Sequence, residues 1–260
     1  MSTMTAPSIK PLHHEAEEYL PESDGKPMAE TDVHRDNMIG LLHALKEKFR
    51  DDPQVYVTGN IFVYYLDGTG VRQTPVSPDI FVVHGVAKKD RRIYKVDDEG
   101  KAPEVVIELT STSTRVEDLV TKHYIYAGLG VREYFLFDPF RENIQTALHG
   151  FRLESGEYVS MTGSHLHSDV LGLDLRVERG LLRLYDSKTG ERLRTPEEAE
   201  ADRRAAEAQA VRELKARQAA EAKVAAAEAK VAQELAARQT AEAELARLRE
   251  ELARFREKNS

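Results

Sequence analysis

Two carboxylates stand beside or inside short apolar segments of the sequence. Asp79 follows Pro78 and precedes the apolar run 80–84, and Glu108 lies within the run Val105–Leu109. A carboxylate in an apolar strand is costly unless it is paired or bound to a metal. Two such acids on neighbouring strands can hold a divalent cation, which lowers the pKa of a bound water and stabilises charge on a phosphate. Asp79 and Glu108 are therefore the candidate ligands of a metal site.

A lysine in the segment that follows Glu108 could orient the attacking water at such a site. Lys122 lies four residues after Asp118 and four before Tyr126, so the three side chains share one face of a helix. Taken alone, Asp118 and Lys122 are more often an ordinary exposed ion pair. That alternative weakens if this face of the helix looks back at Glu108.

A third acid, Glu30, precedes a predicted helix that begins near Asp32. It could be an additional metal ligand, or simply a favourable acid at a helix N-terminus. Both interpretations stay open. His34 is four residues further on and could support a ligand, although an isolated histidine on a helix is more often a surface residue.

Two other groups of residues could do chemistry. The basic cluster Lys88–Arg92 could contact a nucleic-acid backbone, but a solvated loop is the more common role of such a cluster. His165 and His167 alternate in a way that would suit a metal in a strand, but they stand in a Gly/Ser-rich segment that we expect to be a loop. The sequence contains no phosphate-binding glycine loop and no nucleophile elbow.

The elements that must position these residues follow from periodicity and breakers. The spacing of apolar residues predicts a helix over 32–49, capped by Thr31 or Asp32. A second helix is predicted over 115–129, with Thr114 and Glu117 as a capping box. Strands are predicted at 55–66 (with a bulge or turn at Gly59-Asn60), 80–84, 104–109 and 133–137, followed by hairpin-like runs at 146–153, 158–161, 173–177 and 181–185.

This order of elements predicts an α/β fold, with a mixed sheet flanked by helices and an antiparallel hairpin extension. Residues 104–137 form a βαβ unit, which should be a right-handed parallel crossover. We expect residues 1–12 to be disordered, a short helix near 13–19, and one domain over 13–190.

The segment 196–260 has a different composition, with 21 Ala, no Gly and no Pro after Pro196. Strong helix formers without a breaker predict one long helix. A heptad frame places apolar residues at a and d positions, which favours a coiled coil that makes a homo-oligomer, although a partly frayed single helix is the alternative. These residues are Val224, Val231, Leu245, Leu248, Leu252 and Phe255.

The ordered set of motifs over residues 12–190 resembles the Uma family of restriction endonucleases, in the PD-(D/E)XK nuclease superfamily. The motifs are Pro78-Asp79, Glu108 in Val-Ile-Glu-Leu-Thr-Ser-Thr-Ser-Thr, Asp118-Leu-Val-Thr-Lys122, the run Tyr126–Tyr134, and Asp138-Pro139. The resemblance implies a restriction-endonuclease-like fold. It also implies cleavage of DNA phosphodiester bonds that depends on Mg²⁺, with Mn²⁺ as the alternative ion.

The resemblance also implies roles for individual residues. Asp79 and Glu108 match the metal-binding acids, and Glu30 matches an acid before or within the first helix of many superfamily members. The superfamily lysine would stand at Thr110, and Lys122 matches a lysine displaced onto the following helix. Asp118 matches a recurrent acid of the family. The catalytic set implied is Asp79, Glu108 and Lys122.

Composition limits the remaining functions. The absence of Cys excludes a disulfide scaffold, a Cys-ligated zinc site and a thiol nucleophile. No apolar run is long enough to span a bilayer, and no signal peptide is recognisable, so we expect a cytoplasmic protein. The net charge of −8 argues against bulk electrostatic binding of DNA. Two other functions stay open: a degenerate nuclease that only binds nucleic acid, and an adaptor that acts through its coiled coil.

Overall fold

The computed structural model describes residues 20–23, 25, 31–110, 116–140, 147–163 and 165–258, without the side chains of 116–119 and 255–258. The predictions for residues 1–19, for Glu30, for the Thr114–Glu117 capping box, and for the side chains of Asp118 and Phe255 lie outside this set. The chain divides into two compact units after Pro196.

The first unit begins with the predicted helix. Helix α1 runs over Asp32–Lys48, and the backbone N–H of His34 donates to the Thr31 hydroxyl, which caps the helix. Leu41, Ala44 and Leu45 bury the apolar stripe of α1 against one face of the main sheet.

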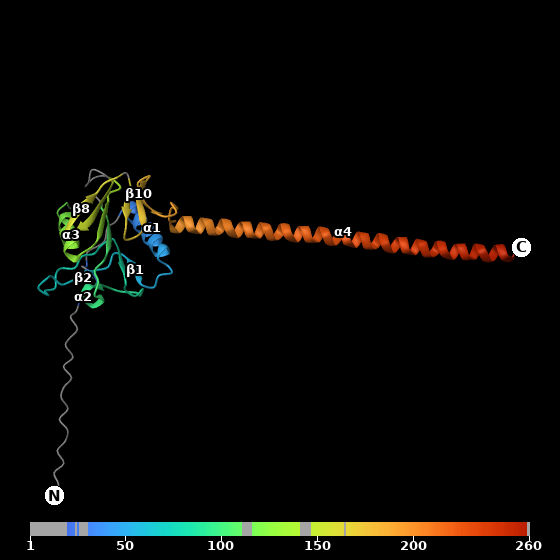
Figure 1. The fold of residues 1–260 in the computed structure, drawn as a ribbon, viewed down its shortest axis with the longest axis horizontal. Helices are drawn as coiled ribbons and strands as arrows, with labels where there is room; N and C mark the ends of the chain where they lie inside the picture. Colours follow the sequence, from blue (N-terminus) through green and yellow to red (C-terminus); the bar gives the residue numbers. More distant parts are fainter. Residues whose placement is uncertain are drawn as a thin grey trace, which may run out of the picture. The chain divides into compact units, whose positions relative to one another are not determined.

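The main sheet has six strands in the order β1-β3-β5-β6-β7-β8. Figure 1 labels its two edge strands, β1 and β8. Its only parallel pair is β5 and β6, which α3 (Val116–Leu129) connects, as the βαβ prediction required. All other neighbours in this sheet are antiparallel. The strands are β1 (Val55–Thr58), β3 (Ile80–His84), β5 (Val105–Leu109), β6 (Glu133–Phe137), β7 (Leu148–Glu154) and β8 (Glu157–Met161).

Alternation along these strands builds a core on each face of the sheet. Ile80 and Val82 of β3 join the core that α1 covers, whereas Phe81 and Val83 join the core that contains Tyr126 of α3. The main sheet is therefore buried on both faces, which is why its central strands are predominantly apolar.

A separate antiparallel sheet completes the core that α1 covers. It has the order β11-β10-β9, with β9 at Leu166–Ser168, β10 at Leu173–Glu178 and β11 at Leu181–Asp186. The expectation of a loop at 165–167 is wrong at Leu166 and His167. Leu166 and Ser168 are buried and pair with β10, while His167 faces outward. The flanking Gly and Ser residues obscured a strand of only three residues.

The predicted strand 55–66 is also corrected, because it is two strands in two sheets. After β1 the chain leaves the main sheet at Gly59-Asn60, and β2 (Val63–Tyr64) pairs in parallel with β4 (Tyr94–Lys95), next to the short helix α2 (Val96–Glu99). Asn60 adopts a left-handed φ of 53°, and its N–H donates to the Pro78 carbonyl at 2.9 Å. This bond ties the break in the strand to the residue before Asp79.

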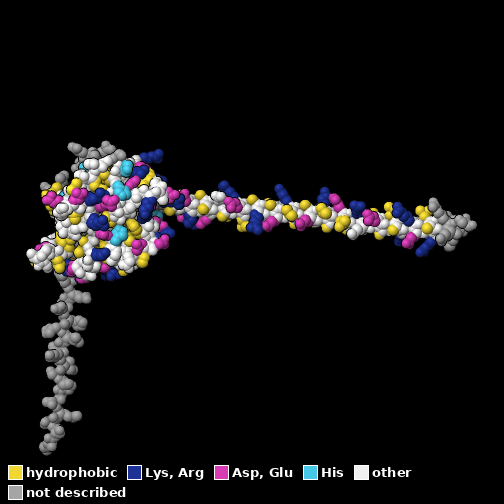
Figure 2. Space-filling view, in the orientation of Figure 1, with side chains coloured by type: hydrophobic (Ala, Val, Ile, Leu, Met, Phe, Trp, Pro, Cys, Tyr) yellow, Lys and Arg dark blue, Asp and Glu magenta, His cyan; other side chains and the backbone are white. Residues whose placement is uncertain are grey.

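The second unit is the long helix α4, over Pro196–Lys258, as the composition predicted. From Ala201 onward its described side chains are exposed, and Figure 2 shows charged side chains of both signs mixed with apolar ones along the helix. The fold class predicted from sequence is thus confirmed. No helix among the described residues is both long and apolar enough to cross a membrane.

Gly59 gives the first testable prediction. A Cβ at this position would lie 1.8 Å from the carbonyl oxygen of Asp79, a backbone atom that cannot move aside without shifting the Asp79 carboxylate. We expect Gly59→Ala to lower the free energy of unfolding by about 3 kcal/mol, measured by urea denaturation. Gly68→Ala is the control, because a Cβ there meets no atom within 4 Å, and it should change stability by less than about 1 kcal/mol. Equal stabilities of the two variants would refute this account of Gly59.

Candidate metal and catalytic site

The pairing of β3 and β5 brings the two predicted acids together. Ile80 pairs with Ile107, so Asp79 and Glu108 stand opposite each other at the same end of two neighbouring strands. The Leu109 backbone N–H donates to Asp79 Oδ2 at 2.7 Å, which fixes the Asp79 carboxylate against β5. The register therefore places both acids at one point of the sheet.

Helix α3 supplies the polar partners of Glu108. The Glu108 side chain is only 4 % exposed, its Oε2 accepts from Lys122 Nζ at 3.0 Å, and its Oε1 accepts from the Tyr126 hydroxyl at 2.6 Å. Lys122 and Tyr126 are one helical turn apart, so both look back at β5. The ordinary exposed ion pair considered for Lys122 does not describe this environment.

Burial dominates the electrostatics of this site. The pKa of Glu108 is raised to about 7, mainly by loss of solvent. The charge of Asp79 also raises it, while the charge of Lys122 and the hydrogen bonds from Tyr126 and Lys122 lower it. Burial and the Glu108 charge also raise the pKa of Tyr126 well above its ordinary value, so its hydroxyl stays protonated and donates. Two carboxylates in such surroundings favour a nearby cation.

His34 of α1 joins the site from the other face of the sheet. It is 8 % exposed, and its Nε2 lies 3.7 Å from Asp79 Oδ1. The structure therefore places His34 beside Asp79, a candidate ligand. Of the two roles considered from the sequence, support of a ligand fits this position and a surface role does not.

Sequence reasoning missed two donors of this site. Tyr126 was placed on the right helix face but given no role, and its position four residues after Lys122 was the available signal. The Leu109 N–H is a backbone group, which no residue type could reveal. Thr110, at the superfamily's lysine position, is buried, and its N–H donates to the Phe137 carbonyl.

The donor set suits a hard cation with few protein ligands. Among the described residues no group of three or more His, Cys, Asp or Glu side chains could hold a metal. Two adjacent carboxylates fit Mg²⁺, which keeps several waters and is commonly bound through one or two carboxylates. Glu30 lies outside the described residues and stays a prediction.

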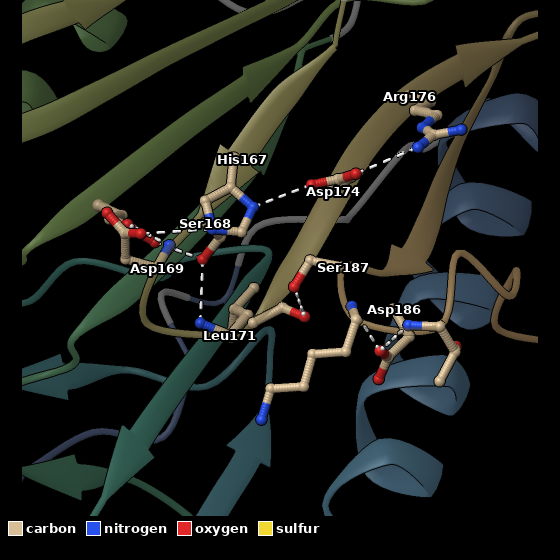
Figure 3. A network of polar contacts seen from close by, with 12 residues as sticks. His167, Ser168, Asp169, Leu171, Asp174, Arg176, Asp186 and Ser187 are labelled. Atoms are coloured by element: carbon tan, nitrogen blue, oxygen red, sulfur yellow. Dashed lines mark hydrogen bonds and ion pairs between the residues drawn. The ribbon is translucent and has the colours of Figure 1, made fainter.

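The other histidine candidate belongs to a different network. Figure 3 shows His167 between two acids, with Nδ1 2.9 Å from Asp174 and Nε2 3.3 Å from Asp169. Beside it, the Ser168 hydroxyl and the Asp169 N–H donate to the buried Glu133 of β6. These contacts join β9 to the main sheet and explain the polar residues there without a metal.

Comparisons with known proteins bear on the class of this site. The family model Uma2, described as "Putative restriction endonuclease", matches residues 18–181. A solved structure from Anabaena variabilis ATCC 29413, described as "a putative nuclease belonging to DUF820", is similar with a TM-score of 0.43 and 16 % identity, over 58 % of this chain and 86 % of that chain. No curated protein matches the chain.

The raised pKa of Glu108 predicts how stability depends on pH without metal. The folded state binds the Glu108 proton more tightly than the unfolded chain, so this group's contribution to stability is complete below about pH 4.5 and is lost as pH rises through about 7. In EDTA, we expect Glu108→Gln to remove on the order of 3 kcal/mol of this decline, measured by urea unfolding between pH 5 and 8.

The exposed carboxylate of Glu157 on β8 supplies the control. Glu157→Gln should leave the pH profile of the parent protein unchanged. An equal slope in the parent and in Glu108→Gln would show that Glu108 titrates normally in the folded state.

Proposed function

Because the chain belongs to the Uma2 family of restriction endonucleases, we propose that it is a metal-dependent endonuclease that hydrolyses phosphodiester bonds in DNA. Family membership supports a nuclease function, and the convergence of Asp79, Glu108 and Lys122 at one end of β3 and β5 is the observation that carries the finer proposal. The metal, the substrate and the catalytic residues are parts of this proposal, and so is a cytoplasmic location.

Asp79 and Glu108 would hold the ion, Mg²⁺ or alternatively Mn²⁺, with Glu30 as a proposed further ligand. When bound, the ion supplies a water of lowered pKa and stabilises negative charge on the phosphate. The protein's own part is to keep two carboxylates at one point. The Leu109 N–H holds Asp79, and the Tyr126 hydroxyl holds Glu108.

Lys122 is the proposed group that orients the attacking water. Its Nζ lies 3.0 Å from Glu108, and its side chain is 18 % exposed, so the ammonium is held by the carboxylate yet still reaches solvent. In this position it can direct a water molecule toward a phosphate near the two acids, and its charge offsets the negative charge that develops there.

Cleavage of DNA tests this assignment. We expect the parent protein to cut plasmid or single-stranded DNA with Mg²⁺ or Mn²⁺ and not in EDTA. Asp79→Asn, Glu108→Gln and Lys122→Ala should each reduce the rate by roughly 10²-fold or more, because each removes a ligand or a charge used in the transition state. Asp79→Asn should also abolish Mg²⁺ binding in calorimetry.

Lys215→Gln on α4 and Glu157→Gln on β8 are the matched controls, since both side chains are exposed. Both should cleave at the parent rate. If the parent is no faster than the three site variants, catalysis by this site is ruled out. DNA binding that persisted without cleavage would then favour the degenerate nucleic-acid-binding protein.

We also propose that α4 pairs with α4 of a second copy. A described helix of 63 residues exposes Val224, Val231, Leu245, Leu248 and Leu252 by half or more. An isolated helix gains little from propensity alone, and burial of these residues against an identical helix would stabilise it. This supports a homo-oligomer, and it also keeps open a function as an adaptor.

Light scattering after size exclusion tests the pairing. Leu248→Glu with Leu252→Glu should shift the oligomer to a monomer, because charges would replace apolar residues in the seam. Gln233→Glu with Gln239→Glu is the control outside the proposed seam and should leave the mass unchanged. A chain that ends at 196 should be monomeric. If the parent and this truncated chain have the same oligomer number, the pairing is refuted.

A further inference from the structure

A pocket of about 620 Å³ lies between the C-terminal end of α1, the edge strand β1 and the segment 88–91. Five cationic side chains line it: Lys46, Arg50, Lys88, Lys89 and Arg91. They come from two segments that are distant in sequence, so only the fold brings them together. The basic cluster singled out in the sequence is one wall of this pocket.

The acids that face these cations do not balance them. Asp90 lines the pocket, Glu47 pairs with Arg50, and Glu99 pairs with Lys89 and Arg91. Three acids against five cations leave two positive charges in excess. This excess stands out in a chain whose net charge is −8.

Two of the lysines carry the unbalanced charge. Lys46 has no ion-pair partner among the residues that the structure describes. Lys88 Nζ donates to the carbonyls of Phe49 and Arg50 at 2.7 and 3.0 Å, and these neutral acceptors leave its charge uncompensated. A pocket with such a surplus suits an anion.

The wall of the pocket is firmly held. The Arg91 side chain is 4 % exposed, donates to both carboxylate oxygens of Glu99, and lies 4.1 Å from the centre of the Tyr56 ring. The segment is an exposed loop, as expected, except at Arg91, whose side chain is held against Glu99 and Tyr56. A fixed backbone presents Lys88 and Lys89 without the entropy cost of ordering a loop.

The distance between the pocket and the candidate site matches the length of several nucleotides of one DNA strand. His34 lies beside Asp79 near the start of α1, and Lys46 follows twelve residues later on the same helix. At 1.5 Å per residue the separation along α1 is roughly 18 Å. One strand of duplex DNA advances about 3.4 Å per phosphate, so this separation corresponds to roughly five nucleotides.

We propose that this basic pocket binds two adjacent backbone phosphates of the DNA strand, about five nucleotides from the bond positioned at Asp79 and Glu108. The inference rests on the proposed nuclease function and adds a substrate contact remote from the reacting atoms. In an acidic protein, a local anchor of this kind supplies the attraction that the net charge does not.

Salt dependence of binding is the direct test. We expect Lys46→Gln with Lys88→Gln to weaken binding of a fluorescent 20-base-pair duplex in EDTA by about fivefold to tenfold at low salt. The slope of log K against log salt should become smaller by about two, one for each phosphate-facing charge removed. Lys188→Gln with Lys215→Gln removes two exposed charges elsewhere and should leave the slope unchanged. An unchanged slope in the pocket variant would overturn the proposal.

Two further arms identify the source of the phosphate. A duplex of four base pairs is too short to reach from the site to the pocket, so the pocket variant and the parent should bind it equally. If instead a mononucleotide binds the parent in calorimetry, and the pocket variant loses only that binding, the ligand is a free nucleotide and the DNA contact is refuted.

Kinetics separate this proposal from the proposed function. The pocket variant should raise KM for the long duplex about fivefold and leave kcat within twofold of the parent. Cleavage with an unchanged KM would refute the pocket and keep the nuclease. A protein that cuts no DNA, but whose DNA binding loses two units of salt slope in the pocket variant, would keep the pocket and refute the nuclease.

Discussion

The structure depends on how a buried carboxylate is accommodated. Glu108 lies in a strand with apolar neighbours on both faces of the sheet, where an ionised group is expensive unless its partners replace water. Lys122 and the Tyr126 hydroxyl make those replacements. They do so incompletely, because the pKa of Glu108 still rises to about 7. A raised pKa at a point where two acids meet identifies a candidate functional site.

The surrounding fold can be understood as the means of keeping that point fixed. The antiparallel register sets Asp79 opposite Glu108, and the parallel crossover through α3 returns two donors over β5. Because Gly59 has no side chain, the chain that leaves the main sheet after β1 can pass in contact with the Asp79 backbone. Each device acts on the backbone, so the geometry does not rely on flexible side chains alone.

Sequence reasoning predicted the features that depend on local pattern. The helix at 32–49, the strand 80–84 and the long helix after Thr195 follow from periodicity and breakers, and the structure confirms them. It failed where tertiary contacts decide. Val63 leaves the main sheet to pair with Tyr94, and Leu166 forms a strand only because Leu175 is beside it. Likewise, the spacing of Lys122 and Tyr126 predicted a shared face, but their bonds to Glu108 required the packing of α3 on the sheet.

The acidity of the chain imposes the last constraint on a DNA-cutting function. An acidic protein repels DNA at long range, so attraction must come from local positive charge, and binding through that charge depends on salt. A cation between Asp79 and Glu108 would neutralise the negative charge of these carboxylates at the candidate active site. The excess of cations between α1 and the segment 88–91 would hold the same strand some 18 Å away. Pairing through α4 would double both contacts and raise the effective concentration of the second site once the first has bound. Weak local attraction then suffices for binding. The acidic net charge limits the binding of DNA that cannot reach both the candidate metal site and the basic pocket.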